Sequence, residues 1–410
     1  MRSKYKLLHH VIIISCCMSC SNGDNKQTQI AALSHRFEQR MTDAGIVALN
    51  RGGPRYPGDI TLDLDLVLGA EEGPEEYIFF TPTGLAVDGQ GRMFIFDWDR
   101  KGIQVYDREG QYLRTLGREG QGPGEFDRMG AADLFIHPDG TIDAIASAGA
   151  SWKRWAPNGD LLFDYRAFNQ RVSQGVNRYP TRAGITSFAR TRRSSELDTM
   201  NAWWIFRLAR DAEREGVVAS YPLGRRSFAQ DIGVGTVLPY IATLCISRGL
   251  SGRFAVTTGD SAWFDLYDDG FSHCSTVRWE ELPEPLERQE FLDAYWEIPG
   301  NDPDRPNDPV WEFYQTVDPP SDKPVIYELL IDNDDRIWVR LWGQRGWPEG
   351  WGPAPDHVTY AVFNREGEYL YRFALPFLVR AVDSDFIYEL FNDGEHTPQI
   401  RRYRWDPPKG

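Results

Sequence analysis

Short apolar runs separated by turn-forming residues recur along this chain, and this alternation predicts β-strands. Residues 83–117 contain the runs TGLAVD, RMFIFD, IQVYD and QYLRTLG, with Gly- and Asp-containing turns between them. Runs of this length, bounded by turn formers, are typical of antiparallel strands joined in a meander. Four such strands in one repeat predict a propeller blade.

The pattern recurs along the chain with decreasing fidelity. Further repeats begin at AADLFIHP, NRYPTR, IATLCIS and VIYELLID, whereas the last segment, FLVRAVD to QIRRYRW, supplies only three strands. One spare strand, DITLDLDLVL at residues 59–68, alternates apolar and acidic residues as a half-buried edge strand does. We therefore predict an all-β fold over residues 58–406, a six-bladed β-propeller of four-stranded antiparallel blades. The N-terminal strand would complete the last blade and close the ring, which protects the sheet edge.

The segment GREGQGPGEF at residues 117–126 raises the alternative of a phosphate-binding loop, because three glycines stand at alternate positions. A loop of that kind leads directly into a helix, whose N-terminus meets the phosphate. Here a strand-like run, AADLFI, follows instead. A related segment, GAEEGPEEYIF from Gly69, keeps the position and lacks two of the three glycines. We interpret the glycines as a connector between repeats.

The best-preserved repeat resembles the NHL repeat. The residues that carry the resemblance are Pro82, Gly84, Asp97, Ile103, Gln104, Val105, Tyr106, Asp107, Gly110 and Gly117. The later stretch YELLIDNDDRIWVRLW with VFNREGEYLYRFALP is similar to the final blades of bacterial six-bladed propellers, many of them exported or lipid-anchored. The resemblance implies the fold but no particular function, because this architecture hosts enzymes and binding proteins alike.

The first residues read as an export signal. Arg2, Lys4 and Lys6 precede a short apolar run at residues 7–14, which is too short to span a bilayer. The following letters, IISCCMSCSNGD, resemble a bacterial lipoprotein signal, with a plain secretory signal as the alternative. This resemblance implies lipidation of Cys16 or Cys20. The protein would then be exported to the cell envelope and face the periplasm or the cell exterior.

We assign residues 1–20 to the lipoprotein-type signal segment and residues 21–57 to a polar tether, with a short helix near His35 to Ala44. The formal net charge is −15, and an acidic surface repels phosphate backbones and anionic lipid. We therefore expect no nucleic-acid partner, and contact with a membrane only through the N-terminal anchor.

The loops expected to hold a ligand lie on one face of the propeller, where second-to-third-strand loops and blade connections open around the channel. The loop at residues 343–358, GQRGWPEGWGPAPDHV, is far longer than its counterpart WDRKG in the first repeat, and long loops in compact repeats often have a function. The candidate ligand-binding residues on this face are Trp98, Arg100, Trp342, Arg345, Trp347, Trp351 and His357. Exposed aromatic rings can stack on sugars or apolar ligands. The alternative is that the tryptophans fill a small core of the loop itself.

An insertion at residues 280–324 leaves from a blade-to-blade connection on the same face. It begins with a predicted helix near Pro285 to Trp296, in which Phe291, Leu292 and Tyr295 share one face. The insertion is either a lid over the channel or an ornament packed on the neighbouring blades.

No catalytic or metal-ligating residues can be assigned. Beyond the signal segment, the sequence contains no His-x-His, no Cys-x-x-Cys and no Gly-x-Ser-x-Gly, and its Asp-rich strings lack the spacing of a calcium loop. We predict a non-catalytic propeller that binds a small molecule, a glycan or an envelope protein, without an identified cofactor. The alternative is a metal-dependent, lactonase-like hydrolase or lyase with calcium in the channel, and a scaffold subunit is a third hypothesis.

Two cysteines lie beyond the signal. The pattern places Cys245 on the first strand and Cys274 on the fourth strand of one blade. Three strand spacings of about 4.8 Å separate such positions, and bridged Cα atoms lie within about 7 Å. We expect two free and mostly buried thiols.

Overall fold

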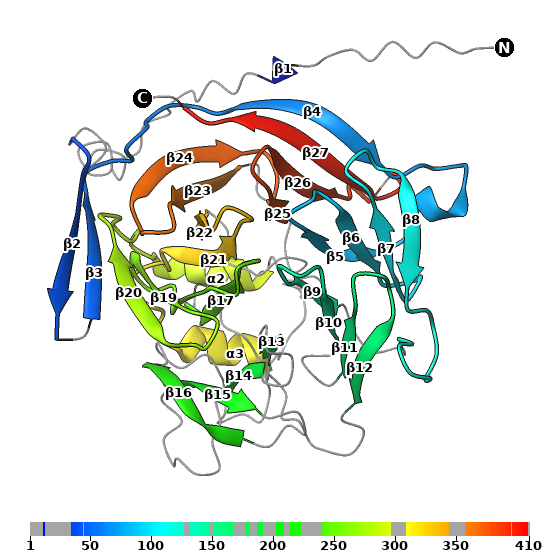
Figure 1. Ribbon diagram of the computed structural model, residues 1–410. Coiled ribbons are helices and arrows are strands. Elements are labelled where there is room, and N and C mark those ends of the chain that lie inside the picture. The colour runs from blue at the N-terminus through cyan, green and yellow to red at the C-terminus, as the bar shows by residue number, and fades with distance from the viewer. Residues whose placement is uncertain are drawn as a thin grey trace.

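The computed structural model describes the chain over residues 11–12, 34–43, 45–126, 132–146, 151–166, 177–180, 187–191, 202–208, 214–222, 240, 242–296, 309–343, 357–394 and 396–408. Within these ranges the protein is an all-β propeller, built from four-stranded antiparallel sheets around a common axis (Figure 1).

Five sheets each contain four strands that are consecutive in the chain. The first sheet has β5 (Pro82–Val87), β6 (Met93–Asp97), β7 (Gly102–Tyr106) and β8 (Tyr112–Leu116). The second has β9 (Ala132–Ile136), β10 (Ile142–Ala146), β11 (Ser151–Trp155) and β12 (Leu161–Arg166). The third has β13 (Asn177–Pro180), β14 (Ser187–Thr191), β15 (Ala202–Leu208) and β16 (Arg214–Pro222). The fourth has β17 (Cys245–Arg248), β18 (Phe254–Thr257), β19 (Trp263–Tyr267) and β20 (His273–Arg278). The fifth has β21 (Ile326–Ile331), β22 (Ile337–Leu341), β23 (Val358–Phe363) and β24 (Tyr369–Leu375).

The remaining sheet combines strands from the two ends of the chain. It joins β25 (Ala381–Val382), β26 (Phe386–Phe391) and β27 (Gln399–Asp406) with β4 (Thr61–Leu68), and β1 (Val11–Ile12) lies on the other side of β4. Strand β4 pairs antiparallel with β27, so that Leu68 lies opposite Ile400 and Leu62 opposite Trp405. Figure 1 shows the two strands side by side, in blue and red.

A repeated aspartate closes the turn between the first and second strands of several sheets. In the first sheet, Asp88 accepts the backbone N–H groups of Gln90 and Arg92 on one oxygen and Arg92 Nε, at 2.6 Å, on the other. Asp332 repeats this arrangement with Arg336, again at 2.6 Å. Aspartate favours such turns because its side chain bonds the backbone two residues on. The DNDD string at residues 332–335 is therefore part of a tight turn.

The glycine-rich segment is a connector between the first two sheets. Phe126 lies between the rings of Phe96, at 5.0 Å, and Trp155, at 5.9 Å, and so fills the space where the sheets meet. Gly117 has a φ of +74°, and a Cβ there would meet the Phe126 ring at 2.5 Å. This glycine is therefore required by the backbone conformation and by the close approach of the ring.

The helix expected near His35 to Ala44 is wrong, because this segment forms a β-hairpin of β2 (Arg36–Thr42) and β3 (Gly45–Arg51). Strand β3 runs parallel to β20 and extends the fourth sheet outward. The Asn50 amide donates to the Gly367 carbonyl at 2.9 Å and accepts the Tyr369 N–H at 2.8 Å. The segment is therefore docked on the fourth and fifth sheets instead of forming a free tether.

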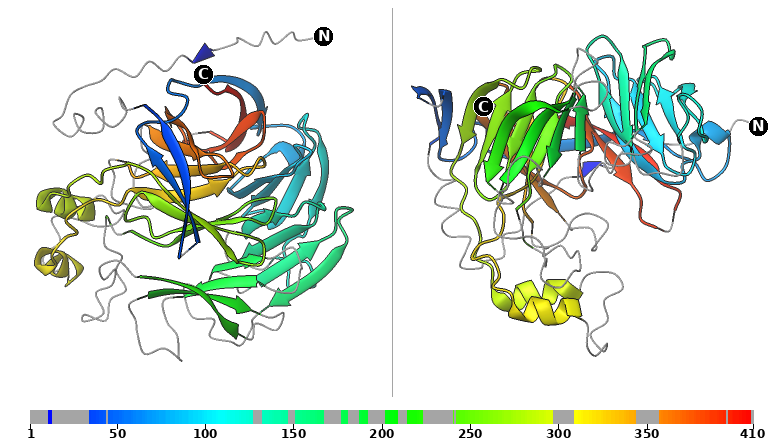
Figure 2. Two further views of the ribbon diagram at one scale, coloured as in Figure 1. Left: turned by 60° about the vertical axis from the view of Figure 1, so that its left-hand side comes forward. Right: turned by 90° about the horizontal axis from the view of Figure 1, so that it is seen from below.

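The part of the chain that the structure describes contains three short helical elements. They are the 3-10 helix η1 (Glu75–Tyr77) and the α-helices α2 (Arg288–Trp296) and α3 (Pro309–Thr316). Helix α2 lies within the helix predicted for the insertion, and Figure 2 shows both α-helices projecting from one face of the sheets. Among the described residues, no helix is long and apolar enough to cross a membrane.

The two cysteines occupy the predicted strands, β17 and β20, and neither of them is in a disulfide. The expectation that they are mostly buried is wrong, because Cys274 is exposed and Cys245 is half-buried. Cys274 lies on the outer strand of its blade, where one sheet face meets solvent.

We predict that Leu62→Ala lowers the free energy of unfolding by about 2–5 kcal/mol. Leu62 on β4 is only 4% exposed and packs in a core with Trp338 and Trp405. Leu64 on the same strand is 47% exposed, and Leu64→Ala should change stability by less than about 0.5 kcal/mol. Urea unfolding of both variants measures the difference, and equal losses would contradict the observed packing of β4.

Candidate binding site in the central channel

A cavity of about 640 Å³ lies on the axis of the propeller, and its walls are residues of the innermost strands β5, β9, β13, β17, β21 and β25. Neighbouring inner strands approach one another closely, as β5 does with β9 and β17 with β21. Apolar and polar side chains are mixed along the walls. The charged lining residues are Asp133, Arg248, Glu328 and Arg380.

An ion pair occupies the start of β21, where the chain enters the channel from the loop-rich face. Glu328 lies opposite Arg340 across the β21–β22 pair, and their nearest charged atoms are 3.5 Å apart. The Arg340 guanidinium also lies over the Tyr327 ring, 4.1 Å from its centroid. Because Arg340 is only 8% exposed, its charge acts in a less polar setting than that of a surface arginine.

Aromatic residues and the helical insertion meet at the same end. Trp342 has its ring 5.1 Å from Tyr327 and 6.1 Å from Tyr240. Tyr240 belongs to a core with Phe291, Tyr295 and Tyr314 of the two helices, and Trp342 packs against this core. Lys323 anchors the returning arm of the insertion by an ion pair with Glu290 at 2.7 Å. The insertion is therefore packed on the propeller through a core of its own.

The predicted site residues are only partly brought together. Trp342 lies at the end of β22 within the aromatic group, and His357 is an exposed residue just before β23. Trp98 and Arg100 are not among the residues that line the cavity. Lys101 Nζ covers the Trp98 ring at 4.0 Å, and Arg100 donates to the carbonyls of Ile78 and Glu75. Arg345, Trp347 and Trp351 lie outside the described residues.

Sequence reasoning missed Glu328 on the inner strand β21 and its partner Arg340 on the neighbouring strand β22. Glu328 and Arg340 stand inside the apolar runs VIYELLID and RIWVRLW. Charged residues are rarely buried unless they are paired. A charge within an apolar strand was therefore the signal that could have marked these two positions.

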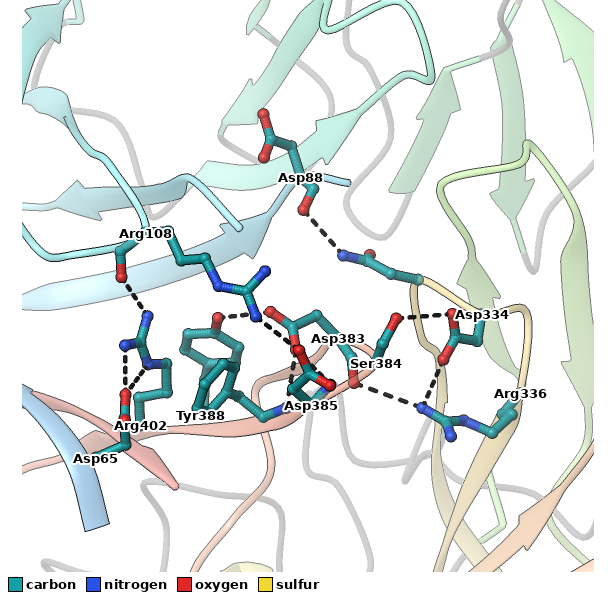
Figure 3. A network of polar contacts seen from close by, with 12 residues as sticks. Asp65, Asp88, Arg108, Asp334, Arg336, Asp383, Ser384, Asp385, Tyr388 and Arg402 are labelled. Atoms are coloured by element: carbon teal, nitrogen blue, oxygen red, sulfur yellow. Dashed lines mark hydrogen bonds and ion pairs between the residues drawn. The ribbon is translucent and has the colours of Figure 1, made fainter. Parts of the chain in front are cut away.

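At the opposite end of the channel, the turns between first and second strands are joined to one another by hydrogen bonds (Figure 3). Asn333 Nδ2 donates to the Asp88 carbonyl at 3.1 Å, and Ser384 Oγ donates to Asp334 at 3.0 Å. Buried Tyr388 donates to Asp383 at 2.8 Å, and burial raises the pKa of this phenol, which keeps it protonated as a donor. The turns of three sheets are thus joined by hydrogen bonds.

A buried polar group in the second sheet lies at this same end. Asp143 is fully buried and accepts Arg154 Nε at 2.6 Å, Trp152 Nε1 at 2.8 Å and His137 Nε2 at 2.6 Å. Burial alone would raise the pKa of Asp143, but the hydrogen bonds from Arg154 and His137 outweigh it, so the pKa is lowered. His137 stands just before the turn between β9 and β10 and is 2% exposed within this group.

The described residues contain no group of three or more His, Cys, Asp or Glu side chains placed to hold a metal ion. The site that the geometry does provide is a channel whose walls mix apolar and polar side chains, with an aromatic end and a hydrogen-bonded end.

Comparisons with known proteins agree with this class of fold. Residues 84–147 match the model of a family described as a 6-bladed beta-propeller, DUF5128. The chain is similar to a solved structure of a DUF4221 family member from Bacteroides vulgatus, with a TM-score of 0.52 and 10% identity over 85% of this chain and 98% of that chain. No curated protein matches the chain in sequence.

Two further solved structures are more distant. A candidate exported protein from Bacteroides fragilis has a TM-score of 0.49 and 9% identity, covering 86% of this chain and 99% of that chain. Virginiamycin B lyase from Staphylococcus aureus has a TM-score of 0.40 and 11% identity, covering 84% of this chain and 99% of that chain. At these identities the similarities concern the fold alone, and the protein is placed among β-propellers without an assigned activity.

We predict that Asp143→Asn lowers the free energy of unfolding by about 3–5 kcal/mol at pH 7, because the change leaves the Arg154 charge buried without its partner. The lowered pKa of Asp143 makes its contribution fully present above the ordinary carboxyl value of 3.8. The difference between wild type and variant should therefore be constant from pH 8 to about pH 5, and shrink below about pH 4. Urea unfolding at a series of pH values measures it.

Asp160→Asn is the matched control, because Asp160 is exposed in the β11–β12 turn of the same sheet and its carboxylate accepts Asn158 Nδ2. A loss for Asp143→Asn no larger than for this control would contradict the buried role of Asp143.

Proposed function

We propose that the protein is a non-catalytic binding protein that takes a small molecule or the end of a glycan into the channel from its loop-rich face. The observation that carries this proposal is the cavity of about 640 Å³, since ligand sites are typically concave spaces of about 300–1,000 Å³ with a few placed polar groups. Glu328, Arg340 and Tyr327 would orient the ligand at the entrance, and Trp342 would border it.

We further propose that the propeller is a closed ring of six NHL-like blades. The sheet of β25, β26, β27 and β4 would be the sixth blade, and the pairing of β4 with β27 supports this interpretation. The family model that matches residues 84–147 carries the same blade number in its description.

Export and lipid anchoring complete the proposal. They are supported by the signal-like pattern at residues 1–20 and by its cysteines. A lipid on Cys16 or Cys20 would hold the propeller at a membrane of the cell envelope.

We predict that a thermal-shift screen of mono- and oligosaccharides, lactones and organic acids yields stabilising compounds whose affinity depends on the loop-rich end. The single variant Glu328→Gln and the double variant Trp347→Ala, Trp351→Ala should each lower the affinity for such a compound about tenfold or more. Under the proposal, the first removes a group that orients the compound and the second removes rings that stack on it. Leu162→Ala, on an exposed position of β12, is the control and should leave the affinity unchanged. Unchanged affinity in every variant would place the ligand elsewhere, and turnover of a lactone would favour the hydrolase alternative.

We predict that one cysteine of the signal carries the lipid. In cells fed labelled palmitate, Cys16→Ser or Cys20→Ser should abolish both labelling and partition into the detergent phase, because the thiol is the attachment point. Cys17→Ser lies between them and should retain both. Equal labelling of all three single variants and of the Cys16→Ser, Cys20→Ser double variant would contradict the anchor.

A further inference from the structure

Arg248 is a buried arginine at the hydrogen-bonded end of the channel. It is the last residue of β17, it lines the cavity, and its side chain is only 1% exposed. A buried guanidinium requires both a compensating charge and acceptors for its five donors, because desolvation penalises the charged form.

The partners of Arg248 do not meet this requirement. Its NH2 group lies 3.3 Å from His137 Nδ1 and 3.4 Å from Asp269 Oδ1, and both distances are long for bonds to a charged donor. Its Nε is buried and has no hydrogen-bond partner in the part of the chain that the structure describes. Asp269 is the nearest carboxylate, and its own side chain is 32% exposed.

Three further described groups lie near Arg248, and none of them is its hydrogen-bond partner. The Phe254 ring lies below the guanidinium, with its centroid 6.0 Å from Cζ. Arg154 is a like charge nearby, and the Asp143 carboxylate is already bonded by Arg154, Trp152 and His137. Burial, the largest cause, lowers the pKa of Arg248 despite the attraction of Asp269 and Asp143, so the cation is incompletely compensated.

We propose that Arg248 anchors an oxyanion, a carboxylate or a phosphate, at the inner end of the channel. An unsatisfied buried donor calls for an explanation, such as an unrecorded water or a bound ion. Of these, a bound ion also supplies a charge that compensates the cation. An oxyanion supplies two or more acceptors and a negative charge, and the planar guanidinium matches it in a bidentate geometry. A neutral ligand group or a buried water would satisfy Nε but not the charge.

This inference rests on the proposed role of the channel as a ligand site, and it adds the chemical class of the group that reaches the channel's inner end. The ligand would enter past Glu328 and Arg340 and place its anionic group against Arg248. The acidic protein as a whole repels anions, so selectivity for this group would come from the local cation.

The test uses inorganic phosphate and acetate as probes with the whole protein. Each is titrated at constant ionic strength, and the unfolding temperature is measured. Wild type should be stabilised saturably by at least one probe, and Arg248→Gln should weaken that effect at least about tenfold. Arg253→Gln is the matched control, because Arg253 lies on the next turn and bonds the Arg365 carbonyl on the outside.

Stabilisation by phosphate alone would identify a tetrahedral oxyanion, and stabilisation by acetate alone a carboxylate. No saturable effect of either probe on wild type, or an undiminished effect in Arg248→Gln, would overturn the proposal. Should Arg248→Gln not fold, Arg248→Lys keeps the charge and loses the bidentate geometry. It should bind the probe about tenfold more weakly than wild type, and equal binding would overturn the assignment.

The outcome is separable from that of the proposed function. If the probe binds at Arg248 and the entrance variants do not change ligand affinity, the anion site is supported and the proposed ligand contacts at the entrance are contradicted. If ligand affinity depends on Glu328 but not on Arg248, the entrance contacts are supported and the anion site is contradicted.

Discussion

The antiparallel pairing of β4 with β27 is the interaction on which the rest of the structure depends. It joins residues 61–68 to residues 399–406 and gives the outer edge of β27 a hydrogen-bonded partner. Arg402 reinforces the pairing, because its guanidinium bonds both Asp65 on β4 and the Arg108 carbonyl of the first sheet. Leu68 then packs with Phe79 and Tyr106, so β4 also contributes to the core shared with the first sheet. The junction therefore holds both ends of the propeller chain against the first sheet.

Much of this fold could be predicted from hydrophobic periodicity and turn residues. The strand order within a blade, the connector at residues 117–126 and the cysteine strands all follow from local pattern. The β2–β3 hairpin could not be predicted, because its stability comes from tertiary contacts: Asn50 bonds Gly367 and Tyr369, which lie over 300 residues away. A polar segment with weak local preference takes the structure that its docking surface imposes.

The candidate site was harder to predict than the fold for a related reason. Loop length and tryptophan content predicted a site at residues 343–358. The channel walls are instead made by inner strands, whose sequence pattern is the same as that of ordinary core strands. Arg248, His137 and Asp143 come from two sheets and lie close together only in three dimensions. No spacing along the sequence records such a convergence. Trp98 and Arg100 have local partners in Lys101, Ile78 and Glu75, which the sequence alone does not distinguish from ligand contacts.

The two ends of the channel differ in how their backbone is held. At one end, aspartates bond the turn amides and the turns bond one another, as Asn333 does with Asp88 and Arg336 with the Asp383 carbonyl. Such a network fixes side chains within a narrow range of positions, as a site for a defined charged group requires. At the other end, Trp342 stands between Tyr240 and Tyr327, and the helices of the insertion share its core. Apolar packing is less directional than hydrogen bonding, so under the proposed function this end would accept varied shapes. A propeller with these ends would recognise one feature of a ligand strictly and the remainder loosely.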